Sequence, residues 1–148
     1  MTKGQPADHY AQLGNALLAP PPDDPEAERD YYRLFLSPQG ASCPPWQSVH
    51  LEAEGESPRL MGPSHHSALE WYRRYGFEPS AETEPADHAG LLLLFYAKLI
   101  EAGEEDTVLA EFEQRHLKWL PRLAEKMAQH ARTELFRNLA AELAECGG

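Results

Sequence analysis

One stretch of the sequence, residues 89–97, is strongly apolar and is the longest of its kind in the chain. It is far shorter than the roughly 20 residues that a membrane-spanning helix requires. Every residue from 91 to 96 is apolar, so a helix here has no polar face, and such helices are usually buried centrally. We therefore predict a buried helix over about residues 87–102, ended by Gly103, with other helices packed around it.

The rest of the pattern is also helical, and clusters of proline separate the helices. Helices are predicted over residues 7–18, 25–36, 64–75 and 105–119, and residues 121–146 are predicted to form a sixth helix or a sixth and a seventh. Asp24 and Pro25 suit the N-cap and first turn of the second helix, and Ser64 and Gly76 suit the two ends of the third. The proline-rich residues 37–63 are predicted to form a long loop.

These elements predict an all-α, single-domain helical bundle of about six helices over residues 1–148, because no alternating strand pattern is present. The chain carries 13 basic and 24 acidic residues, a net charge of −11, which argues against binding to duplex DNA and favours a basic partner. Cys43 and Cys146 make no disulfide framework, and the N-terminus has no apolar signal core. We expect a cytoplasmic protein.

Motifs for several kinds of catalysis are absent from the sequence. It has no glycine-rich phosphate loop, no G-x-S-x-G motif and no C-x-x-C pair. Glu113 and His116 have the E-x-x-H spacing of half a di-iron site, but the other half is missing, so we expect a surface Glu and a partly buried His. His65 and His66 are expected at a solvated helix start, and Cys43 is expected to be an inert thiol. No metal site is predicted.

Two short proline-containing segments are candidate recognition sites. In residues 84–88, Asp87 is predicted to cap the central helix and His88 to lie in its first turn; this is either a simple capped helix start or a polar point beside an apolar bundle. A nucleophile is missing, so recognition is favoured over catalysis. In residues 44–49, Trp46 is either a rigid surface for gripping a peptide or an anchor that plugs the bundle.

Several short motifs follow one another along residues 28–145 in a characteristic order. They are Tyr32-Arg33-Leu34-Phe35, Pro44-Pro45-Trp46-x-Ser48-Val49, Leu60-Met61-Gly62, Trp71-Tyr72-Arg73-x-x-Gly76-Phe77, Glu84-Pro85-Ala86-Asp87-His88 and His116-Leu117-x-Trp119-x-Pro121. In this order and spacing, the motifs resemble those of the TorD/DmsD/NarJ group of redox-enzyme maturation chaperones. The segment around Asp87 and His88 is the most diagnostic of them.

The resemblance implies an all-helical cytoplasmic chaperone that is not an enzyme. Such a protein binds the twin-arginine signal peptide, or another part, of an apo-molybdoenzyme and holds it back from export until its molybdenum cofactor is inserted. The positions that match the peptide groove of similar proteins are Tyr31, Leu34, Phe35, Pro45, Trp46, Ser48, Pro85, Asp87 and His88. The resemblance implies no cofactor of the chaperone's own, and the sequence neither supports nor excludes nucleotide binding.

The chain departs from the family pattern in two ways. Leu92 and Leu94 stand where the central helix of similar proteins usually carries acidic residues. Only about thirty residues precede the Tyr-x-Leu-Phe segment, fewer than is common, so the N-terminal part is shorter than usual for the family. A shorter bundle leaves an apolar face exposed, which favours a homodimer or a swapped arrangement.

Charge gives an independent physical argument for the same partner. A twin-arginine leader has an arginine pair followed by an apolar stretch, and an acidic protein with an apolar groove complements both parts. Glu82, Glu84 and Asp87 are candidate partners of the arginines. The alternative is a small helical interaction or regulatory module without an export role, and an enzyme that uses His88 or His116 is the least favoured hypothesis.

Overall fold

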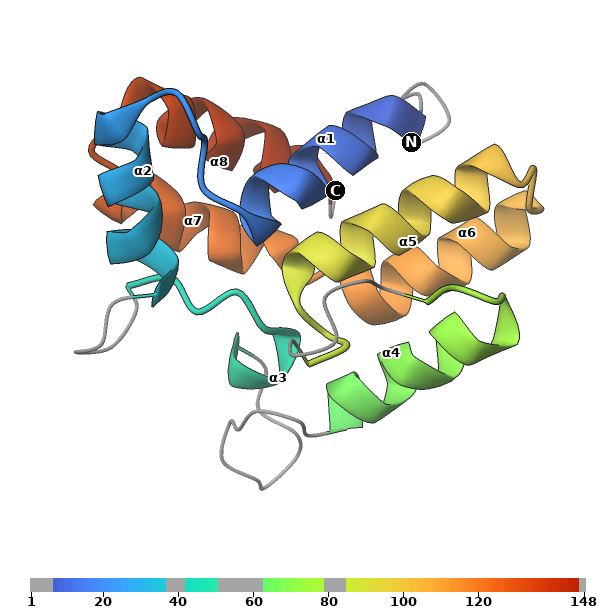
Figure 1. Ribbon diagram of the computed structural model, residues 1–148. Helices are drawn as coiled ribbons and strands as arrows, with labels where there is room; N and C mark the ends of the chain where they lie inside the picture. Colours follow the sequence, from blue (N-terminus) through green and yellow to red (C-terminus); the bar gives the residue numbers. More distant parts are fainter. Residues whose placement is uncertain (1–6, 37–41, 51–62, 79–84, 147–148) are drawn as a thin grey trace.

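The computed structural model describes residues 7–36, 42–50, 63–78 and 85–146, which form an all-α bundle without a β-strand (Figure 1). The α-helices are α1 (Ala7–Leu18), α2 (Pro25–Tyr31), α3 (Gln47–His50), α4 (Pro63–Arg74), α5 (Ala89–Glu101), α6 (Asp106–Phe112), α7 (Leu120–His130) and α8 (Glu134–Cys146). Two π-helical turns, η2 (Tyr32–Leu36) and η3 (Glu113–Leu117), continue α2 and α6. The prediction of an all-α fold is confirmed.

The described residues contain eight α-helical segments rather than about six, for two reasons. The stretch from 121 to 146 is interrupted at Ala131, whose extended backbone ends α7, so both a sixth and a seventh helix form there. The predicted long loop contains the short helix α3, and residues 37–41 and 51–62 of that loop lie outside the described residues. A four-residue helix leaves no periodic signal in the sequence.

The predicted helix ends at Asp24, Gly76 and Gly103 are confirmed, and the one at Ser64 is wrong. Asp24 accepts a hydrogen bond from the backbone N of Ala27 at the start of α2, at 3.1 Å. Gly76 and Gly103 adopt φ angles of +70° and +74° after α4 and α5, a conformation that L side chains rarely adopt. Ser64 does not cap α4, because that helix already begins at Pro63.

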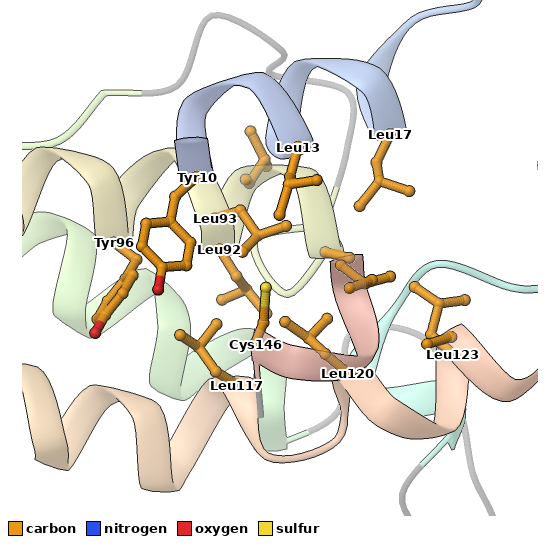
Figure 2. Close-up of a cluster of buried hydrophobic side chains, with 14 of the residues drawn as sticks. Tyr10, Leu13, Leu17, Leu92, Leu93, Tyr96, Leu117, Leu120, Leu123 and Cys146 are labelled. Carbon is orange, nitrogen blue, oxygen red and sulfur yellow. The ribbon is translucent and has the colours of Figure 1, made fainter. Parts of the chain in front are cut away.

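Helix α5 is the centre of the bundle, as its apolar sequence predicts. Nine of its 13 residues are buried, while Lys98 is exposed. Both α1 and α6 pack against α5, and α7 packs against α8 (Figure 1). Figure 2 shows side chains of α1, α5, η3, α7 and α8 converging on one apolar cluster; the labelled members include Leu13, Leu17, Leu92, Leu93, Leu117, Leu120, Leu123 and Cys146. Leu92 is therefore a core residue here.

Helices α1 and α5 approach each other closely at two glycines. A Cβ atom added to Gly14 would lie 2.7 Å from the carbonyl oxygen of Gly90, and one added to Gly90 would lie 2.5 Å from Cγ of Leu18. The second Cβ would also lie 2.7 Å from the carbonyl oxygen of Gly14, and a backbone atom cannot simply rotate away. Glycine at both positions is thus a steric requirement of this helix crossing.

Replacing either glycine by alanine is expected to destabilise the fold. Gly90→Ala and Gly14→Ala should each lower the free energy of unfolding by about 1–3 kcal/mol, because the helices must move apart to admit the methyl group. Urea unfolding followed by circular dichroism measures this change. Asn15→Ala, at an exposed position of the same helix, is the matched control and should not lower the stability. Unchanged stability of Gly90→Ala would contradict the close approach.

Candidate functional site

Two segments that lie far apart in the sequence are joined just before α5. Trp46 and His88 form an isolated antiparallel β-bridge, in which the backbone N of Ala89 donates to the carbonyl oxygen of Pro45 at 2.8 Å. The backbone N of Gln47 donates to the carbonyl oxygen of Asp87 at 3.1 Å. The rings of Trp46 and His88 meet edge to face, with their centroids 5.8 Å apart. The two candidate recognition segments therefore meet at one junction.

Asp87 holds the two segments together, and this role differs from the predicted one. Its side chain is completely buried, and Oδ2 accepts a hydrogen bond from the backbone N of Ser48 at 2.7 Å. Asp87 therefore caps the first turn of α3, so the prediction that it caps α5 is wrong, and its side chain is not exposed as predicted. Glu82 and Glu84, the other candidate partners, lie outside the described residues.

Two buried oxygen atoms at this junction have no hydrogen-bond partner among the described residues. They are Oδ1 of Asp87 and Oγ of Ser48. Burying a polar atom without a hydrogen bond costs free energy, typically about 1–3 kcal/mol, so such pairs are uncommon in folded proteins. Trp46, in the same junction, is partly exposed.

His88 is the N-cap of α5, whereas the prediction placed it in the first turn of that helix. Its Nδ1 accepts a hydrogen bond from the backbone N of Gly90 at 3.0 Å, so Nδ1 carries no proton. The residue is 4% exposed, and burial lowers the pKa of His88 to about 4. The imidazole is therefore neutral at pH 7. The helix starts one residue later than expected, which moves the cap from Asp87 to His88.

Helix α4 holds the turn before α5 in place. The backbone N of Ala86 donates to Nδ1 of His65 at 2.8 Å, and the hydroxyl of Tyr72 donates to the carbonyl oxygen of Ala86 at 2.6 Å. His65 is buried, so its predicted place at a solvated helix start is wrong, whereas His66 is exposed. Burial also lowers the pKa of His65. The turn that carries Asp87 is thus held by hydrogen bonds to both backbone groups of Ala86, its N–H and its carbonyl oxygen.

Three of the predicted site residues lie in the core, away from this junction. The hydroxyl of Tyr31 donates to the carbonyl oxygen of Leu17 at 3.1 Å, and the ring of Phe35 packs against Phe136 with centroids 6.0 Å apart. Leu34 is completely buried. Their spacing along one helix face is typical of core residues, and this signal distinguishes them from surface contacts. The exposed residues of the same turn are Tyr32 and Leu36, each 47% exposed.

His116 is 1% exposed and more deeply buried than predicted. Its two ring nitrogens lie within hydrogen-bond distance of Gln47 and Ser67, and sequence reasoning did not identify either of these residues. Glu113 is engaged elsewhere, because its carboxylate accepts a hydrogen bond from the hydroxyl of Tyr96. Within the described residues no three His, Cys, Asp or Glu side chains gather as a metal-binding group. Burial raises the pKa of the Cys43 thiol to about 11.

Comparison with known families gives the class of protein. The sequence pattern of the nitrate reductase delta subunit family matches residues 4–131. The chain belongs to this family, and its resemblance to the TorD/DmsD/NarJ group is confirmed.

Curated relatives carry one recurring name, the Tat proofreading chaperone DmsD. The protein of this name from Salmonella typhi is 33% identical over 102 residues, which cover 68% of this chain and 48% of the relative. That from Salmonella paratyphi A is 29% identical over 127 residues, which cover 85% of this chain and 61% of the relative. The chain thus spans about half to three fifths of the length of these two relatives.

The fold also matches a solved structure. The crystal structure of a candidate redox enzyme maturation protein from Archaeoglobus fulgidus superposes with a TM-score of 0.68 and 20% sequence identity, covering 98% of this chain and 95% of that chain. At this identity the match shows a shared fold. Among the helices that the structure describes, none is long and apolar enough to span a bilayer.

The buried histidines predict a loss of stability in mild acid. His88 and His116 bind a proton near pH 6.5 when unfolded but only near pH 4 when folded, because burial lowers both pKa values. Their neutral forms stabilise the fold fully above pH 6.5, and this stability is lost as the pH falls toward 4, by at most about 3 kcal/mol per histidine. Urea unfolding at several pH values measures the slope.

A variant separates the contribution of His88 from the rest. Asparagine is a good N-cap and does not titrate, so His88→Asn should keep α5 capped and flatten the stability curve between pH 6.5 and pH 4. If the curves of the parent and His88→Asn run parallel over this range, burial of a neutral His88 is not a source of the acid sensitivity.

Proposed function

We propose that this protein is a cytoplasmic chaperone that binds the twin-arginine signal peptide, or another part, of an apo-molybdoenzyme and assists its maturation before export. Family membership and the name shared by the curated relatives support this class of function. The proposed role requires peptide recognition and no catalysis by this chain. The relatives extend beyond the length covered here, so the proposal concerns the part of the binding site that this chain contains.

The junction of the two proline-containing segments is the observation that carries the proposal. It contains the partly exposed Trp46 and two buried oxygens that have no hydrogen-bond partner in the described part of the chain, Oδ1 of Asp87 and Oγ of Ser48. A peptide that displaces part of the cover over these oxygens can supply the missing hydrogen bonds, from its backbone N–H groups or from a guanidinium. Trp46 supplies the aromatic contact that dominates many peptide interfaces.

The nine predicted site residues take two roles in this proposal. Six of them lie at the junction, namely Pro45, Trp46, Ser48, Pro85, Asp87 and His88; Trp46 and Pro85 are partly exposed and the other four are buried. Tyr31, Leu34 and Phe35 are buried, and we propose that they support the neighbouring surface from the core. The net charge of −11 supports an arginine-containing partner, because an acidic surface accelerates the encounter with a basic peptide.

Titration with signal peptides tests the proposal. By isothermal titration calorimetry, a peptide with an arginine pair and an apolar stretch should bind the parent protein, and the same peptide with lysines or alanines in place of the pair should bind more weakly. Trp46→Ala should weaken the binding at least about tenfold while the helicity is retained, since aromatic anchors carry a large share of interface energy. Failure of the parent to bind any of the peptides would rule out signal-peptide recognition.

One control variant and one further test variant complete this titration. Leu135→Ala removes an exposed apolar side chain on α8 and should leave the affinity unchanged. Asp87→Asn keeps an oxygen acceptor for the backbone N of Ser48 but replaces the carboxylate by a neutral amide. It should therefore lower the affinity for the arginine peptide more than the affinity for the alanine peptide. An equal loss of affinity for both peptides would show that the carboxylate of Asp87 does not recognise the arginine pair.

A further inference from the structure

The segment that carries Trp46 has little regular structure of its own to hold it. Helix α3 has only four residues, one turn, and such a short helix has no independent stability. The orientation of Trp46 and Ser48 therefore depends on contacts that this segment makes with the rest of the bundle. One of these contacts comes from Gln47, which lies between the two residues and is 3% exposed.

The side chain of Gln47 joins α3 to the π-helical turn η3 by two hydrogen bonds. Its Nε2 lies 2.8 Å from the carbonyl oxygen of Arg115, and its Oε1 lies 2.8 Å from Nδ1 of His116. A carbonyl oxygen can only accept, so the amide nitrogen must face Arg115 and the amide oxygen must face His116. The orientation of the Gln47 amide is thereby determined by its partners.

The same argument determines the protonation of His116. Because Oε1 of Gln47 can only accept, Nδ1 of His116 carries the proton, and in a neutral imidazole Nε2 is then an acceptor. The hydroxyl of Ser67 lies 3.0 Å from Nε2 and donates to it. Burial, and to a smaller extent Arg115, lower the pKa of His116 to about 4, so this neutral form is present at pH 7. A chain of hydrogen bonds therefore runs from α4 through η3 to α3.

The opposite end of α3 is also attached to the bundle. The ring of His50 packs against Trp119 with centroids 5.2 Å apart, and Arg122 donates to the carbonyl oxygen of His50 at 3.2 Å. The indole N of Trp119 donates to the carbonyl oxygen of His116 at 2.8 Å. Both ends of α3 are consequently attached to the chain around η3 and the start of α7.

We propose that Gln47 and His116 are positioning residues, which hold Trp46 and Ser48 in the orientation that binds the client peptide. This inference rests on the proposed function. Neither side chain needs to touch the peptide, because both residues are buried. Loss of the Gln47 amide leaves Nδ1–H of His116 and the carbonyl oxygen of Arg115 without their partner, and the segment must then shift to satisfy them.

Substitution of Gln47 tests the positioning role. Gln47→Leu has nearly the same size but makes neither hydrogen bond, and it should weaken binding of the arginine-pair peptide at least about tenfold. Gln47→Glu is the second variant; it keeps an acceptor for His116 and places an oxygen against the carbonyl of Arg115, so it should act in the same direction. Gln114→Leu, the same substitution at an exposed position of η3, is the matched control and should bind like the parent.

A second readout reports on Trp46 without any peptide. With 5-fluorotryptophan incorporated, the ¹⁹F resonance of Trp46, assigned from Trp46→Phe, should broaden or split in Gln47→Leu and Gln47→Glu. The resonance of Trp71, buried on α4, should remain unchanged and shows that the core is intact. Circular dichroism confirms that the variants remain helical.

The two readouts distinguish failure of this inference from failure of the proposed function. An unchanged Trp46 resonance in the folded variants would overturn the positioning role whether or not a peptide binds. A changed resonance with unchanged peptide affinity would overturn it as well, because the orientation of Trp46 would then not matter for binding. If the parent binds no peptide, signal-peptide recognition is ruled out, and the resonance still decides whether Gln47 holds Trp46.

Discussion

The close packing of α1 against α5 is the constraint on which the rest of the structure depends. Because Gly14 and Gly90 have no side chains, the two backbones come close enough for the leucines of both helices to enter one core. Gly90 is also the residue whose backbone N is capped by His88. The crossing that builds the core thus places the first turn of α5, and with it the neighbouring site.

Buried hydrogen bonds connect the start of α5 to the segment that carries Trp46. The turn before α5 is held from α4 through Ala86, and Asp87 in turn holds Ser48. Hydrogen bonds of this kind contribute modestly when made but cost more when one partner is lost, so the bonds that are made here favour one arrangement. A rigid arrangement suits a binding surface, since little conformational entropy is then lost when a peptide binds.

Much of the helical framework was predictable because it depends on local patterns. The apolar run of α5, the Asp24–Pro25 start of α2 and the glycine ends after α4 and α5 all act through neighbouring residues. The first predicted helix, Ala7–Leu18, has the predicted bounds. The site was predicted only as two separate segments, and the assignments of Asp87 and His88 were displaced by one residue because helix starts are set by hydrogen bonds that include tertiary partners.

The sequence by itself determined the helical class, the central helix and the family, because periodicity and motif order are properties of the chain alone. Only the tertiary structure decided which residues share the site. Contacts between residues 39 positions apart, such as Ser48 with Asp87, and 69 apart, such as Gln47 with His116, depend on the folded path of the chain. The same path buries Tyr31 and Phe35 and leaves Trp46 partly exposed, since burial is decided by the elements packed around each residue.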